Sequence, residues 1–262
     1  MVKVTSKKIE TGLALGIGET HIWYSDIHMV VSSGMLSCYT LLLNSDERSR
    51  LEQLCDDKVR CQYLVARALL RSTLTLYFPL VSETDWQFST NAYGKPYITN
   101  VGYEDVFFNL SHTEKMVVLA IAHKQEVGID IEHLDTAIDC MEVASAFFHP
   151  DEIERLNVST PELKTKHFIQ MWTLKEAYVK ARGKGLSLPL NSFAVDLTLP
   201  YKLVNHGTNG AVTKYWHFWQ KQLEHRHIVA MVQASEEACF IPQVKIRKSI
   251  PQLQARQPYA AD

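Results

Sequence analysis

Apolar residues along this chain repeat at two spacings, which predict helices in some stretches and strands in others. From about residue 45 to 76 they return every three or four positions, as in an amphipathic helix, with a break near Asp56 and Asp57. The polar face expected for this helix carries six basic residues, namely Arg48, Arg50, Lys58, Arg60, Arg67 and Arg71.

Period-two alternation predicts several short strands in the first half of the chain. These are residues 21–27, 86–89, 106–110, 116–122 and 126–132. Because only short connections separate the last three, we expect them to pair as an antiparallel meander.

The second half repeats this mixture of elements. It contains a helix candidate over 137–148, a second that Pro150 can open, and a long one after Pro161 that runs through Glu176 and stops at Gly183. Strands over 192–199, 215–223 and 227–234 are expected to form a second sheet.

This pattern predicts an α+β fold with two similar lobes in a pseudo-twofold arrangement. Each lobe would be a small antiparallel sheet packed with a long helix, and the active site would lie in the cleft between them. The expected organisation is a leader (1–20), an N-terminal lobe (21–125), a C-terminal lobe (126–240) and a tail (241–262), which we expect to be a surface strap or disordered.

Composition narrows the classes of function. The 262 residues include 27 basic and 29 acidic side chains, so the net charge of -2 disfavours a nucleic-acid or anionic-membrane partner. The five cysteines never occur as CxxC, which argues against a zinc site or a disulfide framework. Without a signal peptide or a membrane-spanning stretch, the protein is expected to be cytoplasmic.

Two acidic sites could share a cation. In a strand, alternation places Asp130 and Glu132 on one face about 7 Å apart, and Glu176 could join them from the long helix. Oxygen ligands favour Mg²⁺ or Mn²⁺. The alternative interpretations are a solvated strand face and, for Glu176 with Lys180, an ordinary pair of charges on a helix surface.

Two turns could bind an anion. Asn109-Leu-Ser111-His112 ends a strand with a hydroxyl and an imidazole, although the Asn and Ser side chains could equally bond their own backbone. Without G-x-S-x-G, catalysis by a Ser111 nucleophile is not expected. Lys95-Pro96 stands on a second, rigid turn, and the absence of a P-loop leaves phosphate binding to side chains.

The chain resembles the Sfp-type 4′-phosphopantetheinyl transferases in five motifs that occur in the family's order. They are Y-G-K-P at 93–96, F-N-L-S-H at 108–112, V-G-I-D-I-E at 127–132, F-F-H-P-D-E at 147–152, and W-T-L-K-E-A-Y-V-K at 172–180 followed by G-K-G-L-S-L-P-L at 183–190. The resemblance runs from about residue 21 to 234.

The resemblance implies magnesium-dependent transfer of 4′-phosphopantetheine from coenzyme A to a serine of an apo carrier protein, with release of adenosine 3′,5′-bisphosphate. It further implies that Asp130, Glu132 and Glu176 hold the metal and that Glu176 is the base. Lys175 and Lys180 would neutralise the pyrophosphate.

The resemblance assigns the remaining positions to coenzyme A or to supporting roles. Ser111 and His112 would hold the adenosine 3′-phosphate in the N-terminal lobe, and Lys95 and Pro96 would form the coenzyme A loop. Arg50 would grip the nucleotide end with Arg48 beside it, and Glu152 would act in support.

Carrier proteins commonly present acidic helices, so we expect the docking surface to be basic and apolar, with Lys184 and Leu186 beyond the glycine stop. A chain that builds its own cleft is expected to be a monomer. Two other functions stay open: a non-catalytic carrier-binding module, and a magnesium-dependent phosphoesterase or nuclease that uses the same carboxylates.

Overall fold

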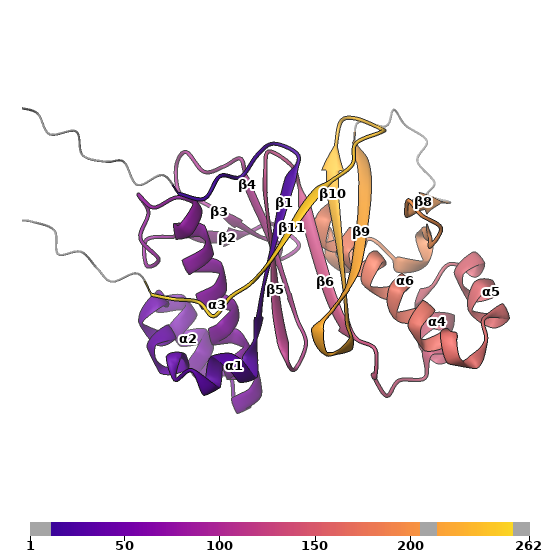
Figure 1. Cartoon of the computed structure of the whole chain (residues 1–262), viewed down its shortest axis with the longest axis horizontal. Helices are drawn as coiled ribbons and strands as arrows, with labels where there is room; N and C mark the ends of the chain where they lie inside the picture. Colours follow the sequence, from indigo (N-terminus) through magenta and orange to yellow (C-terminus); the bar gives the residue numbers. More distant parts are fainter. Residues whose placement is uncertain (1–11, 205–213, 254–262) are drawn as a thin grey trace, which may run out of the picture.

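The computed structural model describes residues 12–204 and 214–253. Two sheets lie at the centre of the molecule, with one group of helices on the side of the first sheet and a second group on the side of the other (Figure 1). The α+β class is therefore confirmed, while the pseudo-twofold relation stays a prediction. Most of the predicted leader, residues 1–11, lies outside the described residues.

The first sheet has four strands in the order β11-β1-β5-β4. Strands β1 (Glu19–Asp26), β5 (Met116–His123) and β4 (Val106–His112) are antiparallel neighbours, whereas β11 (Gln243–Lys248) runs parallel to β1. The tail is thus partly regular, since residues 243–248 form an edge strand, and the first sheet is not built from 21–125 alone.

Helix α3 (Asp57–Tyr77) packs its apolar face on this sheet. It follows α1 (Ile27–Ser32), the 3-10 helix η1 (Met35–Leu42) and α2 (Ser45–Gln53). The predicted break before α3 is confirmed, because the Asp56 carboxylate accepts hydrogen bonds from the first backbone N–H groups of α3.

The second sheet has the order β6-β10-β9 and is antiparallel throughout. Its strands are β6 (Val127–His133), β10 (His227–Ser235) and β9 (Tyr215–Leu223). The long helix α6 (Pro161–Arg182) covers one face, and α4 (Cys140–Phe147) and α5 (Pro150–Val158) pack beside it. No helix in the described part of the chain combines the length and apolar character needed to cross a membrane.

Short elements complete the fold. Two hairpins pair β2 (Phe88–Thr90) with β3 (Pro96–Ile98) and β7 (Ala194–Asp196) with β8 (Lys202–Val204). The 3-10 helices η2 (Gly185–Ser187) and η3 (Leu190–Ser192) follow α6, and η4 (Glu224–Arg226) joins β9 to β10.

Two predicted strand pairings are wrong. Strand β6 does not continue the meander from β5 but pairs with β10, because the apolar face of β6 packs against the first sheet rather than beside it. Residues 192–199 contribute β7 to a separate hairpin, so β6 takes the expected place of that strand in the second sheet.

The two faces of β6 have different neighbours. Val127, Ile129 and Ile131 are buried against residues of β1 and β5. The other face meets α6 at Gly128, where a Cβ atom would overlap the Ala177 carbonyl oxygen and the Ala181 amide nitrogen. The missing side chain therefore lets α6 lie directly on β6 and brings its polar residues beside Asp130.

We predict that Gly128→Val lowers the free energy of unfolding by about 1–3 kcal/mol, because the added atoms must push α6 away from β6. Urea denaturation measures this change. Gly16→Ala is the matched control, since its Cβ would meet only the flexible side chain of Glu19. Equal stability of the two variants would contradict the close approach.

Candidate functional site

Three polar side chains, one each from α6, β6 and β4, are in contact on the face of β6 that packs against α6. Lys180 of α6 places its Nζ 2.6 Å from Asp130 Oδ1 of β6 and donates to Ser111 Oγ of β4 at 2.8 Å. The Ser111 hydroxyl in turn donates to Asp130 Oδ1 at 2.9 Å. This triangle joins both sheets and the long helix at one point.

The local sequence explains the triangle. Alternation along β6 sends Asp130 to the side opposite Ile129 and Ile131, toward α6. On α6, Glu176 and Lys180 are one turn apart and share a face. From β4, the Asn109 side chain accepts a hydrogen bond from the Ile129 amide at 2.9 Å and so fixes β4 against β6.

Buried negative charge around the triangle is only partly compensated. Asp130 is 4% exposed, and its Oδ2 has no hydrogen-bond partner among the described residues. Burial and repulsion from Asp130 raise the pKa of Glu132 to about 7, against the opposing effects of Lys180 and Trp172. Burial and the same repulsion raise the pKa of Glu176. A further cation nearby would therefore stabilise the charged form of all three carboxylates.

The predicted magnesium ligands are close enough to influence one another electrostatically. Among residues 12–204 and 214–253, however, no three carboxylate, histidine or cysteine side chains stand in a geometry that could hold a metal ion. Instead, the Lys180 ammonium pairs with the Asp130 carboxylate and balances its negative charge. The unpartnered Oδ2 and the all-oxygen donor set fit a hard divalent cation, which stays a prediction here.

A cavity of about 760 Å³ opens beside this cluster. Residues from both halves of the chain line it, including Lys95 and Pro96 from the β2–β3 turn and Glu176 and Lys180 from α6. Much of the remaining wall is apolar, with Phe147 and Trp172 among its side chains. The cavity can thus accept a large ligand whose charged part lies near Lys180.

Two further predicted anion-binding residues differ in their surroundings. His112 is exposed at the end of β4, and partial desolvation together with the nearby Lys180 ammonium lowers its pKa. The Lys95 ammonium does not point freely into the cavity. It donates to the Ala181 carbonyl at 2.8 Å and to the Val127 carbonyl at 3.2 Å, and burial lowers its pKa to about 8.

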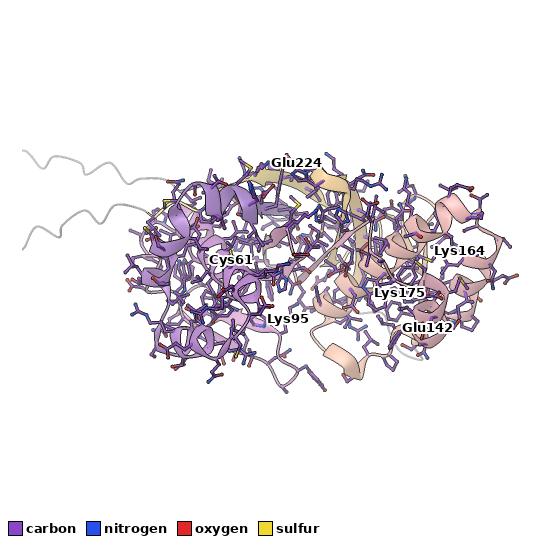
Figure 2. The ribbon with its side chains drawn as sticks, turned by 90° about the horizontal axis from the view of Figure 1, so that it is seen from below. Cys61, Lys95, Glu142, Lys164, Lys175 and Glu224 are labelled. Atoms are coloured by element: carbon purple, nitrogen blue, oxygen red, sulfur yellow. The ribbon has the colours of Figure 1, made fainter. Side chains whose placement is uncertain are left out.

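The expectation that Lys175 faces phosphate does not match its position. Its side chain is fully buried, and Nζ lies 2.6 Å from both Glu152 Oε2 and the Phe193 carbonyl. The Phe193 ring packs against the same ammonium, 4.3 Å from ring centre to Nζ. Figure 2 shows Lys175 among the helices of the second half of the chain, away from Lys95.

Glu152 supplies the negative charge that pairs with the buried Lys175 ammonium. Its carboxylate also accepts hydrogen bonds from the His149 amide at 3.0 Å and the Val195 amide at 2.8 Å. The pair of Lys175 and Glu152 therefore ties α5, α6 and β7 together. Lys175 thus has its contacts inside the second half of the molecule and does not line the cavity.

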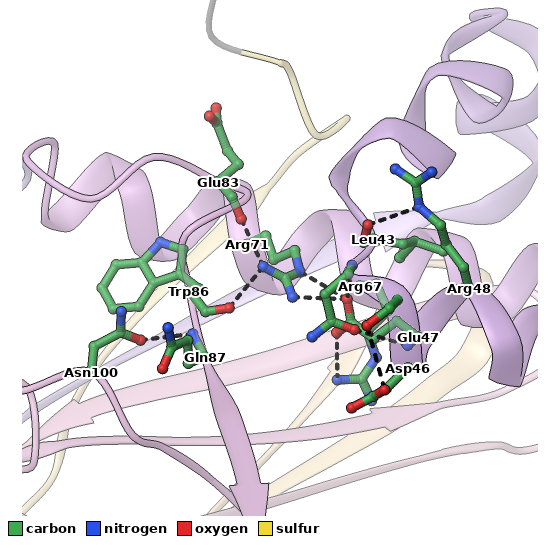
Figure 3. A network of polar contacts seen from close by, with 12 residues as sticks. Leu43, Asp46, Glu47, Arg48, Arg67, Arg71, Glu83, Trp86, Gln87 and Asn100 are labelled. Carbon is green, nitrogen blue, oxygen red and sulfur yellow. Dashed lines mark hydrogen bonds and ion pairs between the residues drawn. The ribbon is translucent and has the colours of Figure 1, made fainter.

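The arginines of the first half differ in exposure. Arg48 and Arg50 are exposed on α2 and do not line the cavity, and Arg48 Nε donates to the Leu43 carbonyl. Arg71, expected on the polar face, is instead fully buried and places Nη2 2.8 Å from Glu47 Oε2 (Figure 3). No local sequence pattern predicts this ion pair, because its two residues are far apart in the sequence.

Comparison with known proteins gives a consistent result. Residues 126–232 match the family model of the 4′-phosphopantetheinyl transferase superfamily. The 4′-phosphopantetheinyl transferase HetI of Nostoc sp. is 33% identical over 193 residues, which cover 73% of this chain and 80% of that protein.

Other matches cover less. The 4′-phosphopantetheinyl transferase Sfp of Bacillus subtilis is 39% identical over 134 residues, and this chain spans only 57% of its length. Among solved structures, holo-[acyl-carrier-protein] synthase of Thermotoga maritima superposes on 43% of this chain and 64% of that chain, with 21% identity and a TM-score of 0.36.

We predict that Lys175→Met lowers the free energy of unfolding by about 3–5 kcal/mol, because it leaves the Glu152 carboxylate buried without its cation. Chemical denaturation measures the loss, with Lys166→Met on the exposed side of α6 as the control. The double variant Lys175→Met/Glu152→Gln should recover part of the loss. A Lys175→Met protein as stable as the control would overturn the structural role.

We also predict a pH dependence from Glu132. Since its folded-state pKa is raised, the folded protein binds more protons than the unfolded chain between about pH 4.5 and 7. This contribution to stability is present at low pH and is lost as the pH rises to 7. Histidines with lowered pKa values act in the opposite sense, so the measured quantity is the difference from Glu132→Gln.

In metal-free buffer, the stability of the wild type relative to Glu132→Gln should decrease from pH 5 to 8. Denaturation curves at several pH values give this difference, and Glu142→Gln on the exposed face of α4 is the control. A difference that stays constant over the whole range would show that Glu132 keeps an ordinary pKa.

Proposed function

Because this chain belongs to the 4′-phosphopantetheinyl transferase family, we propose that it transfers the 4′-phosphopantetheine group of coenzyme A to a serine of an apo carrier protein. The observation that supports this most directly is the position of Lys180. It pairs with Asp130 and lies one helical turn from Glu176, and both α6 side chains line a cavity large enough for part of coenzyme A.

The proposed reaction is a displacement at phosphorus. The serine oxygen forms a bond to the phosphorus that carries pantetheine, and the bond from that phosphorus to the bridging pyrophosphate oxygen breaks. Adenosine 3′,5′-bisphosphate leaves with the electron pair, and the serine proton passes to the Glu176 carboxylate. The raised pKa of Glu176 brings it closer to neutral pH, where a carboxylate is a better base.

Lys180 would stabilise the charge that develops on the pyrophosphate. Two of its N–H bonds point to Ser111 and Asp130, and the third has no acceptor within the described ranges of the chain. Because Lys180 lines the cavity, this third N–H is available to a phosphate oxygen. Positioning and charge neutralisation are the main contributions that a protein makes to phosphoryl transfer.

Asp130, Glu132 and Glu176 would hold the Mg²⁺ or Mn²⁺ ion of the reaction. A bound ion would supply charge neutralisation on the pyrophosphate. The uncompensated charge around Asp130 Oδ2 supports this assignment.

The nucleotide end of coenzyme A would bind the first half of the chain. Ser111 and His112 would hold the 3′-phosphate, and the turn with Lys95 and Pro96 would form one wall of the binding site. Arg50, with Arg48 beside it, would approach the nucleotide from α2.

The carrier protein would dock where the cavity opens beyond α6. Lys184 lies in this region and is exposed, and Phe147 adds an exposed ring, 49% accessible, to the cavity wall. The side chain of Leu186 lies outside the described residues. We propose a cytoplasmic monomer whose two halves are related by a pseudo-twofold axis and enclose the active site between them.

One assay distinguishes the three functions that the sequence left open. The protein is incubated with coenzyme A, Mg²⁺ and an apo carrier protein, and the carrier is weighed by mass spectrometry. A gain equal to phosphopantetheine identifies a transferase. Cleavage of coenzyme A without that gain identifies a phosphoesterase, and the absence of both mass gain and cleavage favours a binding module.

We predict that Asp130→Ala and Glu176→Ala each reduce transfer by at least about 100-fold, because each removes a carboxylate that would hold the divalent cation, and Glu176→Ala also removes the proposed base. The rate of mass gain on the carrier measures this, and circular dichroism verifies folding. Glu162→Ala, exposed in the first turn of the same helix, should keep full activity. Full activity of either site variant at saturating Mg²⁺ would contradict the proposal.

A further inference from the structure

The last turn of α6 is held by a loop from the other half of the molecule. This loop lies between β2 and β3, and its Asn91 side chain donates from Nδ2 to the Gly183 carbonyl at 2.8 Å. From the same loop, Lys95 Nζ donates to the Ala181 carbonyl at 2.8 Å and to the Val127 carbonyl at 3.2 Å. Two side chains of one loop therefore contact the end of α6 and the start of β6.

These contacts supply hydrogen-bond donors and positive charge to the C-terminal end of α6. The last carbonyl groups of an α-helix have no intrahelical donor, and its C-terminus carries partial negative charge. Asn91 supplies a donor, and Lys95 supplies both a donor and a positive charge. Gly183 has a φ of 61°, and a Cβ atom there would lie 2.8 Å from Lys95 Cδ, so glycine lets the loop approach.

Asn91 links the shape of the loop to the helix. Its Oδ1 accepts hydrogen bonds from the Tyr93 and Lys95 amides, each at 2.9 Å. Its Nδ2 makes the bond to Gly183 at the same time. One side chain thus orders the turn that carries Lys95 and fastens this turn to α6.

We infer that Asn91 is a positioning residue that fixes the C-terminal turn of α6 and thereby holds Lys180 in place. The Gly183 amide donates to the Val179 carbonyl at 3.0 Å and to the Lys180 carbonyl at 3.3 Å, so Gly183 and Lys180 belong to one turn of backbone. Loosening that turn moves Lys180 relative to Asp130 and to the cavity. The catalytic part of this inference rests on the proposed transferase function.

A double-mutant cycle tests the link to Lys180. Asn91→Ala is made in the wild type and in Lys180→Ala, and kcat and KM for coenzyme A are measured from mass gain on the carrier. We expect Asn91→Ala to lower kcat about 3- to 10-fold in the wild type and to have no further effect in Lys180→Ala. An equal loss in both backgrounds, or an unchanged kcat in the wild type, would overturn the inference.

Two further variants separate the helix contact from general loss of loop structure. Asn91→Asp keeps the acceptor for Tyr93 and Lys95 but removes the donor to Gly183, so it should lower kcat as Asn91→Ala does. Asn100→Ala removes the side-chain bonds of Asn100 to Gln87 and Asp85 in the same hairpin, away from α6, and should leave kcat unchanged. Full activity of Asn91→Asp would overturn the role of the Gly183 contact.

Hydrogen exchange tests the contact independently of catalysis. In Asn91→Ala and Asn91→Asp, the Arg182 and Gly183 amides should exchange about 10-fold faster than in the wild type, while Asn100→Ala should match the wild type. Unchanged protection in both Asn91 variants would overturn the inference even if the protein transfers no phosphopantetheine. Faster exchange with no transferase activity would reject the proposed function but keep the structural contact.

Discussion

The close contact between α6 and β6 sets the positions of the charged side chains at the candidate site. At Gly128 the helix backbone lies against the strand, and this brings Lys180 within 2.6 Å of Asp130. A side chain of ordinary size at that position would separate the two elements and break the pair. The ionic cluster is therefore a consequence of the backbone packing between α6 and β6.

Two groups of charged side chains along α6 differ in how completely their charge is balanced. In the second half of the chain, Lys175 and Glu152 form a complete pair inside the protein, with backbone groups as further partners. Beside the cavity, by contrast, Lys180 pairs with Asp130, and its positive charge also acts on Glu132 and Glu176. Lys175 and Glu152 balance each other's charge, whereas the carboxylates around Lys180 keep an excess of negative charge. This excess lies beside the cavity, which is therefore the candidate ligand site.

Local sequence patterns predicted the features that depend on local physics. The alternation around Asp130, the helical spacing of Glu176 and Lys180, and the glycine stop at Gly183 all follow from backbone geometry within one element. The pairing of β6 with β10 could not be read in this way, because it depends on which apolar face finds a partner far away in the sequence. The buried positions of Lys175 and Arg71 were missed for the same reason, since a sequence shows charge but not the partner that allows its burial.

The parallel pairing of β11 with β1 has a consequence for how the chain folds. The first sheet contains strands from opposite ends of the described chain, so the edge of β1 that faces β11 has no partner until residues 243–248 have been synthesised. An unpaired strand edge can join other chains, and contacts between distant segments form slowly. During synthesis this edge of β1 therefore stays unpaired until β11 has left the ribosome.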